Sequence, residues 1–252
     1  MKRSEKLVVR SQKSVVGLIG FGRFGKLLAE HLSKRFSIVV FDENGKNGLP
    51  EIHRFASLEE VASQKIIILA VPINQLQNVL KKISPLIQKD ALVIDVCSVK
   101  EKPIAWMKKL LPKSVSILGT HPMFGPDSAA KGLKGKTIVL CPTRISPTVL
   151  KPIFLGLFKE GLEVITASPK FHDEQVAHTQ ALVHFFARSW NEIKFPRTII
   201  STLSFERQNE ISITLMNDSE ELFLDMHRYN RFSKEAREKM MSSLKRVDSM
   251  LV

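Results

Sequence analysis

The sequence is poor in cysteine and contains no long apolar run. Its 252 residues include two cysteines, Cys97 and Cys141, which stand far apart and without the spacing of a zinc site. This argues against a disulfide framework and favours a reducing compartment, so we expect a cytoplasmic protein. No stretch approaches the roughly 20 apolar residues that span a bilayer. The basic start of the chain lacks the apolar core of a signal peptide.

Acidic residues are also few. Against 38 Lys and Arg there are 25 Asp and Glu, a formal net charge of +13. Such a balance favours polyanionic partners, among them nucleic acids, acidic membranes, phosphorylated cofactors and multi-acid substrates. The basic residues are spread along the chain rather than massed in one block. This spread favours a basic soluble enzyme over a protein that binds nucleic acid. We expect an anionic small-molecule substrate and neither nucleic acid nor a membrane as a partner.

Short β-branched runs alternate with amphipathic segments from Ser14 to about Thr166. The runs are continuously apolar, as expected of strands that are covered on both faces. We predict strands over residues 14–20, 37–42, 65–72, 91–98, 114–122, 136–142 and 162–167. Helices are expected between them, at 23–34, 74–83, 100–111 and 147–158. This alternation predicts a parallel, doubly wound α/β sheet domain of the Rossmann type over residues 1–167.

Residues 168–252 contain no convincing strand and are predicted to form a smaller all-helical domain. Helices are expected at roughly 170–193, 197–217, 219–229 and 233–250. Apolar positions such as Ile211, Leu215 and Leu222 recur at helical spacing. Their number exceeds what one short bundle should bury. We therefore expect this domain to pack against the sheet domain and to form a homodimer.

Three glycines lie between the first predicted strand and the first predicted helix. Gly20 permits a tight turn, Gly22 lets the backbone approach a pyrophosphate, and Gly25 lets the helix pack close to the sheet. The helix that begins near Arg23 offers its N-terminal amides to phosphates. Asp42 follows Gly20 by 22 residues, at the end of the second predicted strand, where a carboxylate can accept hydrogen bonds from both ribose hydroxyls. The segment therefore predicts a dinucleotide-binding site.

Asp42 also bears on which dinucleotide binds. A carboxylate there would repel the additional phosphate of NADP, so NAD is favoured. Lys46 could reach that phosphate, and NADP stays possible. We expect further cofactor contacts from Phe24, beside the glycines, and from Val71 and Pro72, at the end of the third predicted strand.

Two polar residues end neighbouring predicted strands: Ser98 in "VIDVCSVK" and His121 in "LGTHPMFGPD". Ligands of open α/β sheets bind outside the carboxyl ends of the strands, so both side chains should face the nicotinamide half of the cofactor. A hydroxyl and an imidazole there can form a hydrogen-bonded pair, and histidine titrates near neutrality. The pair predicts proton transfer beside a hydride transfer. No metal-ligand spacing is present.

Six motifs together resemble the prephenate/arogenate dehydrogenases of tyrosine biosynthesis: "GLIGFGRFGKLLA", "LAVPI", "DVCSVK", "GTHPMFGPDS", "HDEQVAHTQALVHF" and "YNRF". "THPMFGP" and "YNRF" are most similar to the plant-like, arogenate-using branch. The resemblance runs from about Ser14 to Leu244. It implies NAD(P)-dependent oxidation of a cyclohexadienol with loss of carbon dioxide. It also implies that His121 accepts the proton of the ring hydroxyl and that Ser98 orients His121.

The resemblance places part of the substrate site on the helix that begins near His172. It implies that His184 points into the substrate cleft, with Gln180 one turn before it. On a regular helix one stripe carries Asp173, Ala177, Gln180, His184 and Arg188. An anionic substrate also needs a cation, for which Arg188 and Arg207 are candidates. The substrate-binding arginine of bacterial relatives has no unambiguous match in this chain.

Asp127 stands where a glutamate is usual in the family motif. Its carboxylate could attract the ammonium group of arogenate, or it could gate the cleft through a salt bridge. Arogenate is slightly favoured over prephenate, and both stay open. As in relatives, a homodimer through the helical domain is expected.

Two other functions remain open. A β-hydroxyacid dehydrogenase or imine reductase combines a similar cofactor domain with a helical domain. Such enzymes usually carry a catalytic lysine where this helix carries Gln180 and His184. A non-catalytic dinucleotide sensor would not need Ser98 and His121 at neighbouring strand ends.

Overall fold

The computed structural model describes residues 13–45, 54–196 and 199–251. Lys46, which we considered as a phosphate contact, lies outside these residues, as do the basic start of the chain and positions 197–198 of one predicted helix. Within the described part of the chain one sheet has eight strands in the order β3-β2-β1-β4-β5-β6-β7-β8. They are β1 (Val15–Ile19), β2 (Ser37–Phe41), β3 (Arg54–Phe55), β4 (Ile66–Leu69), β5 (Leu92–Asp95), β6 (Ser116–Pro122), β7 (Thr137–Arg144) and β8 (Glu163–Thr166).

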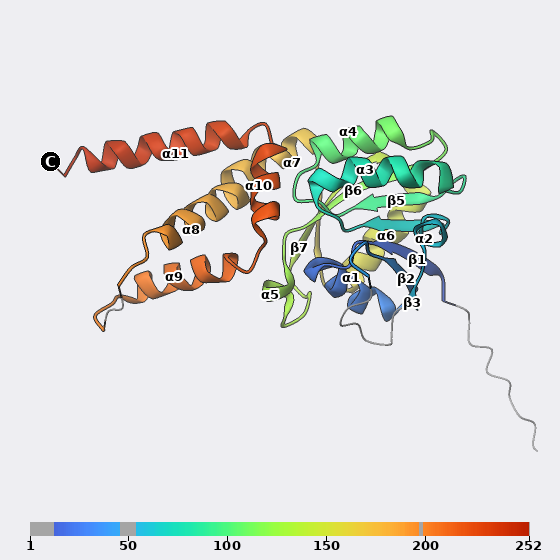
Figure 1. Cartoon of the computed structure of the whole chain (residues 1–252), viewed down its shortest axis with the longest axis horizontal. Coiled ribbons are helices and arrows are strands. Elements are labelled where there is room, and N and C mark those ends of the chain that lie inside the picture. The colour runs from blue at the N-terminus through green and yellow to red at the C-terminus, as the bar shows by residue number, and fades with distance from the viewer. Residues whose placement is uncertain (1–12, 46–53, 197–198, 252) are drawn as a thin grey trace, which may run out of the picture.

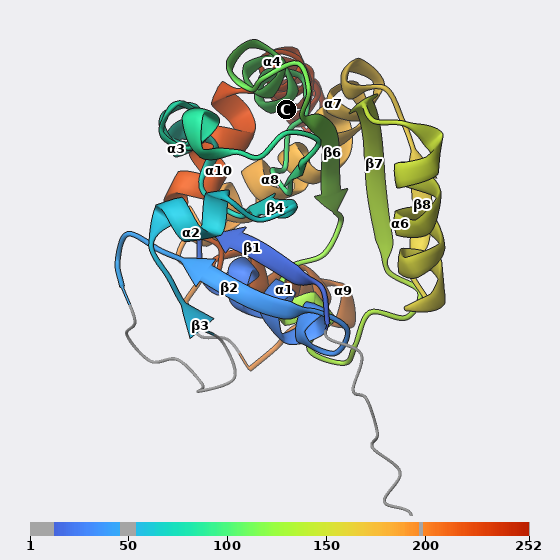
Figure 2. The same ribbon diagram turned by 90° about the vertical axis from the view of Figure 1, so that its right-hand side faces the viewer.

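The seven predicted strands are confirmed, and the two-residue strand β3 is an addition. The sheet is covered on both faces, which explains why its strands are continuously apolar. One face packs against α2 (Leu58–Ala62), α3 (Ile73–Ile83) and α4 (Glu101–Leu110). The other face packs against α1 (Arg23–Ser33) and α6 (Pro147–Lys159). Figure 2 shows these layers, with α3 and α4 above the strands and α6 beside β7 and β8.

The predicted parallel sheet is confirmed except at one pair of strands. β6 and β7 run antiparallel, whereas the other strand pairs in the sheet are parallel. The segment between them contains only the short helix α5 (Pro126–Ala129) in place of a crossover helix that would return the chain to the other end of the sheet. The antiparallel pairing sets His121 opposite Val139, close to the start of β7.

The rest of the chain is helical, as predicted. It contains α7 (Pro169–Val176), a π-helical turn (Ala177–Ala181), α8 (Leu182–Glu192), α9 (Leu203–Leu215), α10 (Glu220–Arg228) and α11 (Ser233–Asp248). Local sequence sets several of the starting points. The side chains of Ser168, Thr202 and Ser219 each accept a hydrogen bond from a backbone N–H of the helix that follows. The helical region therefore fills one end of the molecule.

Figure 1 shows how the two regions meet. The helical region lies beside one edge of the layered sheet, with α7 against α4 and α10 against α3. α11 extends away from the sheet, and α9 lies beside α8. None of the helices in the described part of the chain combines the length and the apolar character that crossing a bilayer requires.

Candidate active site

The glycine turn has the shape that a dinucleotide phosphate requires. Gly20 has φ +98°, and a Cβ there would collide with the carbonyl oxygen of Ala70. A Cβ on Gly25 would collide with the carbonyl oxygen of Gly20, so only glycine lets α1 pack this close to β1. Gly22 has nothing within 4 Å of the place of a Cβ. The turn is thus packed against neighbouring backbone at Gly20 and Gly25 and open at Gly22.

The other predicted cofactor residues surround this turn. Asp42 follows the end of β2, and its Oδ2 accepts a hydrogen bond from the backbone N–H of Phe21 at 2.6 Å. The carboxylate is therefore held against the glycine turn. Val71 Cγ1 lies 3.1 Å from the place of a Cβ on Gly20. Pro72 directly precedes α3. The ring of Phe24, on α1, lies 6.4 Å from that of Phe124 between centroids.

His121 and Ser98 are both buried near the carboxyl ends of their strands, with 3% and 6% of their surfaces exposed. The expected hydrogen bond between them is not formed. Instead, Nδ1 of His121 lies 2.8 Å from Nε2 of His172. The Ser98 hydroxyl is buried without a hydrogen-bond partner. The correction has a physical reason: α7 brings a second imidazole within hydrogen-bonding distance of His121 and occupies its Nδ1.

Asp173 anchors this second imidazole to the sheet region. Its Oδ1 lies 2.8 Å from Nδ1 of His172 and accepts the backbone N–H of Lys100 at 2.6 Å. Its Oδ2 accepts the backbone N–H of Glu101 at 2.9 Å. A carboxylate suits the N-terminus of α4, where backbone N–H groups have no partner within the helix. Asn230, from the "YNRF" motif, donates to the backbone carbonyl of Asp173 at 2.7 Å.

A buried ion pair lies below the imidazoles. The Lys100 ammonium contacts the carboxylate of Asp95 and donates to the carbonyl of Thr120 at 2.6 Å, and neither charged side chain is exposed. Burial raises the pKa of Asp95, against the opposing effect of Lys100. Burial, aided by His172 and Lys100, holds the pKa of His121 well below its usual value. His121 is therefore neutral at pH 7 and able to accept a proton.

Some residues of the helical region carry buried polar atoms that form no hydrogen bond. Oε1 of Gln180 and Nε of Arg188 are buried without a hydrogen bond, as is the Ser98 hydroxyl. Buried polar groups are normally paired, so these three atoms, like those of Asp95, Trp190 and His227, retain the capacity to form a hydrogen bond. Gln180 lies in the π-helical turn, which shifts the helical stripe that we predicted from its regular spacing. Such turns are frequent at functional sites.

His184 and Arg188 both face the segment before α10. Nε2 of His184 lies 3.9 Å from the carboxylate of Asp218, and Arg188 donates to the backbone carbonyl of Asp218 at 3.4 Å. The Arg188 guanidinium also lies 4.5 Å from the centroid of the Phe223 ring. Burial lowers the pKa of His184, although Asp218 opposes this effect. This side of the candidate site thus carries a neutral imidazole and a guanidinium, both next to Asp218.

An ion pair joins the predicted cofactor and substrate residues. Arg23 donates to both oxygens of Asp127 at 2.8 Å and to the backbone carbonyl of Asn217 at 2.8 Å. The guanidinium is 3.7 Å from Asp218 as well. This hydrogen bonding lowers the pKa of Asp127. The contacts connect α1, α5 and the segment before α10 at the surface, so the glycine turn and the helical region meet at Arg23.

Comparison with known proteins identifies the family. Residues 48–163 match the model described as prephenate dehydrogenase, nucleotide-binding domain, and residues 190–252 match the TYRAAT1-like C-terminal domain. Residues 48–163 thus belong to the prephenate dehydrogenase family, and the similar curated sequences are named as arogenate or prephenate dehydrogenases. The first match begins after the glycine turn, so the geometry above describes a part of the site that this match does not include.

Similar sequences come from a plant and an archaeon. The chain is 28% identical to arogenate dehydrogenase 1, chloroplastic, of Arabidopsis thaliana, with 89% of this chain and 37% of that protein covered. It is 29% identical to the probable arogenate/prephenate dehydrogenase of Methanocaldococcus jannaschii, with 94% and 56% covered. The chain thus spans little more than a third and about half of the lengths of these two relatives.

A solved structure shows the same fold. It is prephenate dehydrogenase from Aquifex aeolicus in complex with hydroxyphenyl propionate and NAD⁺, with a TM-score of 0.74 and 21% identity over 96% of this chain and 92% of that one. At this identity the likeness establishes the shared architecture, a mostly parallel layered sheet followed by helices.

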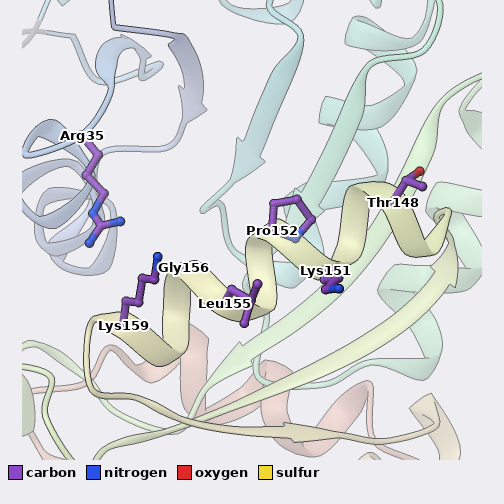
Figure 3. A pocket seen from close by; sticks show the side chains of 7 residues that line it. All are labelled: Arg35, Thr148, Lys151, Pro152, Leu155, Gly156 and Lys159. Carbon is purple, nitrogen blue, oxygen red and sulfur yellow. The ribbon is translucent and has the colours of Figure 1, made fainter.

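Arg207, the second candidate for the substrate carboxylate, is not joined to the other predicted site residues. It is exposed on α9, and within the described residues it forms no hydrogen bond or ion pair with the remaining candidates. Figure 3 shows a hollow along α6 whose lining includes Arg35, Lys151 and Lys159 and none of the predicted site residues.

His172, Lys100 and Asp218 are among the residues of this geometry that were not singled out from the sequence. His172 directly precedes Asp173, and Lys100 follows Ser98 by two positions, so both lie in motifs that carry the resemblance. Their residue types and their positions in these motifs were the features of the sequence that could have marked them. Asp218 stands in "MNDSEEL", where an acid before a helix is common, and no local signal marks it. Among the described residues no group of three or more His, Cys, Asp or Glu is arranged to hold a metal ion.

Proposed function

We propose that this chain catalyses the oxidative decarboxylation of arogenate or prephenate with NAD, with NADP as a possible alternative. The observation that carries the proposal is His121, a buried imidazole with a lowered pKa at the end of β6. The unpartnered hydroxyl of Ser98, buried near the carboxyl end of the adjacent strand β5, supports it. The family match and the names of the relatives support the same reaction.

The residues of the glycine turn fit a dinucleotide. Gly22 and the N-terminal amides of α1 would receive the pyrophosphate, and Asp42 would accept hydrogen bonds from the ribose hydroxyls. Val71 and Pro72, next to the turn, would line the same site, with Phe24 on α1. NAD, when bound, supplies the hydride acceptor.

His121 supplies the proton acceptor for the oxidation. As the ring carbon that bears the hydroxyl loses its hydride, the hydroxyl proton passes to His121, which leaves a ring carbonyl. The bond between the ring and its carboxylate then breaks and releases carbon dioxide. The electron pair of that bond aromatises the ring, and the oxygen regains a proton to give a phenol. A general base of this kind contributes about 10²–10⁴-fold to the rate.

The helical region would bind the rest of the substrate. Gln180 and Arg188 carry buried atoms without a partner, and His184 lies beside them on α8. Arg188 is the preferred partner for a substrate carboxylate because it is partly buried, whereas Arg207 is exposed. Asp127 would attract the ammonium group of arogenate if Arg23 turned from it to a cofactor phosphate. This possibility slightly favours arogenate over prephenate.

An assay of both substrates with both cofactors tests the proposal. Absorbance at 340 nm should rise with release of carbon dioxide in at least one of the four combinations, and most strongly with NAD. Flat traces in all four would refute the proposed reaction. Turnover with simple β-hydroxyacids or cyclic imines would favour the alternative oxidoreductases, and dinucleotide binding without turnover of any substrate would favour a sensor.

We also propose that the helical part, residues 168–252, is a domain that forms a homodimer. Its outer helices expose large apolar side chains to water in the single chain, and contact with a second copy would bury them. They are Ile211, Ile213, Met216, Met241, Leu244 and Val247. Analytical ultracentrifugation tests this: a single monomer species at micromolar concentration would contradict it.

A cytoplasmic location completes the proposal. Cys97 and Cys141 are both free and buried, which suits a reducing compartment. Fluorescence microscopy of a tagged chain would test the location.

A further inference from the structure

We propose that His172 and Asp173 are positioning residues that fix the tautomer of His121 and make its Nε2 the basic nitrogen. This inference rests on the proposed function, because it names how the proposed base is prepared. The observation behind it is a continuous line of contacts. Asp173 Oδ1 lies 2.8 Å from Nδ1 of His172, and Nε2 of His172 lies 2.8 Å from Nδ1 of His121.

The direction of the hydrogen bonds follows from Asp173. Its two carboxylate oxygens already accept the backbone N–H groups of Lys100 and Glu101. An ionised carboxylate can only accept, so the hydrogen between Asp173 and His172 must sit on Nδ1 of His172. Asp173 is completely buried, and the start of α4 holds it in place.

The second hydrogen bond follows from the first. A neutral His172 that carries its hydrogen on Nδ1 has a bare Nε2, which can only accept. His121 must therefore donate from Nδ1, and the hydrogen-free nitrogen of His121 is Nε2. The reverse direction would need a second hydrogen on His172. In that state His172 would be a cation and the hydrogen of a neutral His121 would lie on Nε2, and the nitrogen-15 measurement below distinguishes the two states.

This tautomer decides whether His121 can act as a base. With Nδ1 donating to His172, Nε2 is free to take a proton from the substrate hydroxyl. The opposite tautomer would present an N–H to that hydroxyl and could not accept its proton. Once His121 is protonated, Asp173 lies at the other end of the hydrogen-bonded line and stabilises the positive charge, while Lys100 opposes it.

The line also fixes the position of the ring. Asp173 binds the two residues that follow "CSV", so the same contacts set His121 relative to Ser98. The rings of His121 and His172 meet edge to face, with centroids 5.0 Å apart. Both rings are buried, which restricts rotation of either imidazole. The titratable groups that act on His121 are His172 and Lys100, and these contact the carboxylates of Asp173 and Asp95 in turn.

Nitrogen-15 NMR of histidine-labelled protein tests the tautomer without any turnover. We expect His121, assigned through the His121→Asn variant, to show a protonated Nδ1 and an unprotonated Nε2 near pH 7. In His172→Leu the Nδ1–H population should fall. A protonated Nε2 in the unaltered protein would overturn the inference. Because this readout needs no substrate, it stands apart from the four-combination assay that decides the proposed function.

Kinetics of three variants test the consequence. In His172→Leu, kcat should fall by about 10²–10⁴-fold, with KM and the Kd of NAD nearly unchanged. In His172→Gln, the amide oxygen can take the place of Nε2 and accept from His121, so most of kcat should return. The matched control His178→Gln alters an exposed histidine two turns along the chain and should keep full activity. Full kcat in His172→Leu, or equal losses in the Leu and Gln variants, would contradict the positioning role.

Discussion

His121 and Ser98 lie at or just beyond the ends of buried strands, whereas Gln180, His184 and Arg188 stand on a helix that runs away from the sheet. His121 pairs with Val139 of β7, Ser98 lies three residues beyond the end of β5, and both side chains are buried in the layered region. The second group depends on side-chain contacts with the segment before α10. The comparison suggests a division of labour, in which the sheet end holds the reacting groups rigidly and the helices supply recognition.

The two regions also differ in how they bury apolar surface. Sheet strands and the helices that cover them form nearly all of the buried apolar clusters among the described residues. The outer helices α9 and α11 instead leave large apolar side chains exposed. The sheet region therefore carries most of the stability of one chain, and the outer helices depend on a further partner to cover them.

The largest expected effect is on the sheet side of the site. His121→Asn removes the proposed base, so kcat should fall by about 10²–10⁴-fold with little change in the Kd of NAD. Steady-state kinetics and isothermal titration of NAD measure the two quantities. His178→Asn, at an exposed position on the helical side, serves as the control. Undiminished turnover in His121→Asn would end the proposed division of labour.

A core substitution in each region sharpens the stability comparison. Leu118→Ala, at a fully buried position of β6, should lower the free energy of unfolding by about 2–5 kcal/mol. Leu244→Ala, at a position of α11 that is 50% exposed, should cost roughly 0.5 kcal/mol or less in the monomer. Urea unfolding at low protein concentration measures both. Equal losses would show that the outer helix is buried in solution even at that concentration.

Substitution of two arginines distinguishes binding of the substrate carboxylate from a general effect of surface charge. Arg188→Leu should raise KM for substrate about 10–100-fold, because a charge-assisted hydrogen bond contributes about 1.5–3 kcal/mol. Arg207→Leu removes an equal charge from the exposed face of α9 and should leave KM nearly unchanged. Initial rates over a range of substrate concentrations decide between them, and the reverse result would transfer the carboxylate contact to Arg207.

Cofactor choice is expected to depend on one carboxylate of the sheet region. Asp42→Ser removes the group that would repel the phosphate of NADP, so the ratio of kcat/KM for NADP to that for NAD should rise roughly tenfold. Glu43→Ser, at the next position, is the matched control because Glu43 instead pairs with Lys82 on α3. An unchanged ratio in Asp42→Ser would mean that Asp42 does not contact the ribose.

The smallest expected effect concerns acid stability. Burial lowers the pKa of His121, of His184 and of His227, the last to about 4. Below the ordinary histidine pKa of about 6.5, these histidines bind protons in the unfolded chain but stay neutral in the folded chain until the pH is lower. Stability should therefore fall as the pH drops from about 6.5 towards 4, with Tm lower by about 2–4 °C for each kcal/mol lost. Thermal unfolding at a series of pH values measures this, and a constant Tm down to pH 5 would contradict it.

The sequence was informative wherever a signal is local. Apolar runs of strand length predicted seven strands, and glycines at positions 20, 22 and 25 predicted the turn. Helical spacing predicted the helices after Ser168. The position of His121 at a strand end was also readable, because strand ends in such sheets are where ligands bind. Each of these features depends on residues that are close neighbours in the chain.

Tertiary structure alone decided three features of the site. His172 reaches His121 across 51 positions, and Arg23 reaches Asp127 across 104. The direction of β7 depends on how the chain pairs with the sheet after the short helix α5. No local sequence pattern specifies this pairing. Hydrogen bonds between distant segments form only after the chain has packed, and packing chooses among many polar side chains of suitable type. For that reason the sequence by itself determined the elements and the candidate chemistry of this protein, while the folded arrangement decided that the partner of His121 is an imidazole and not the hydroxyl of Ser98.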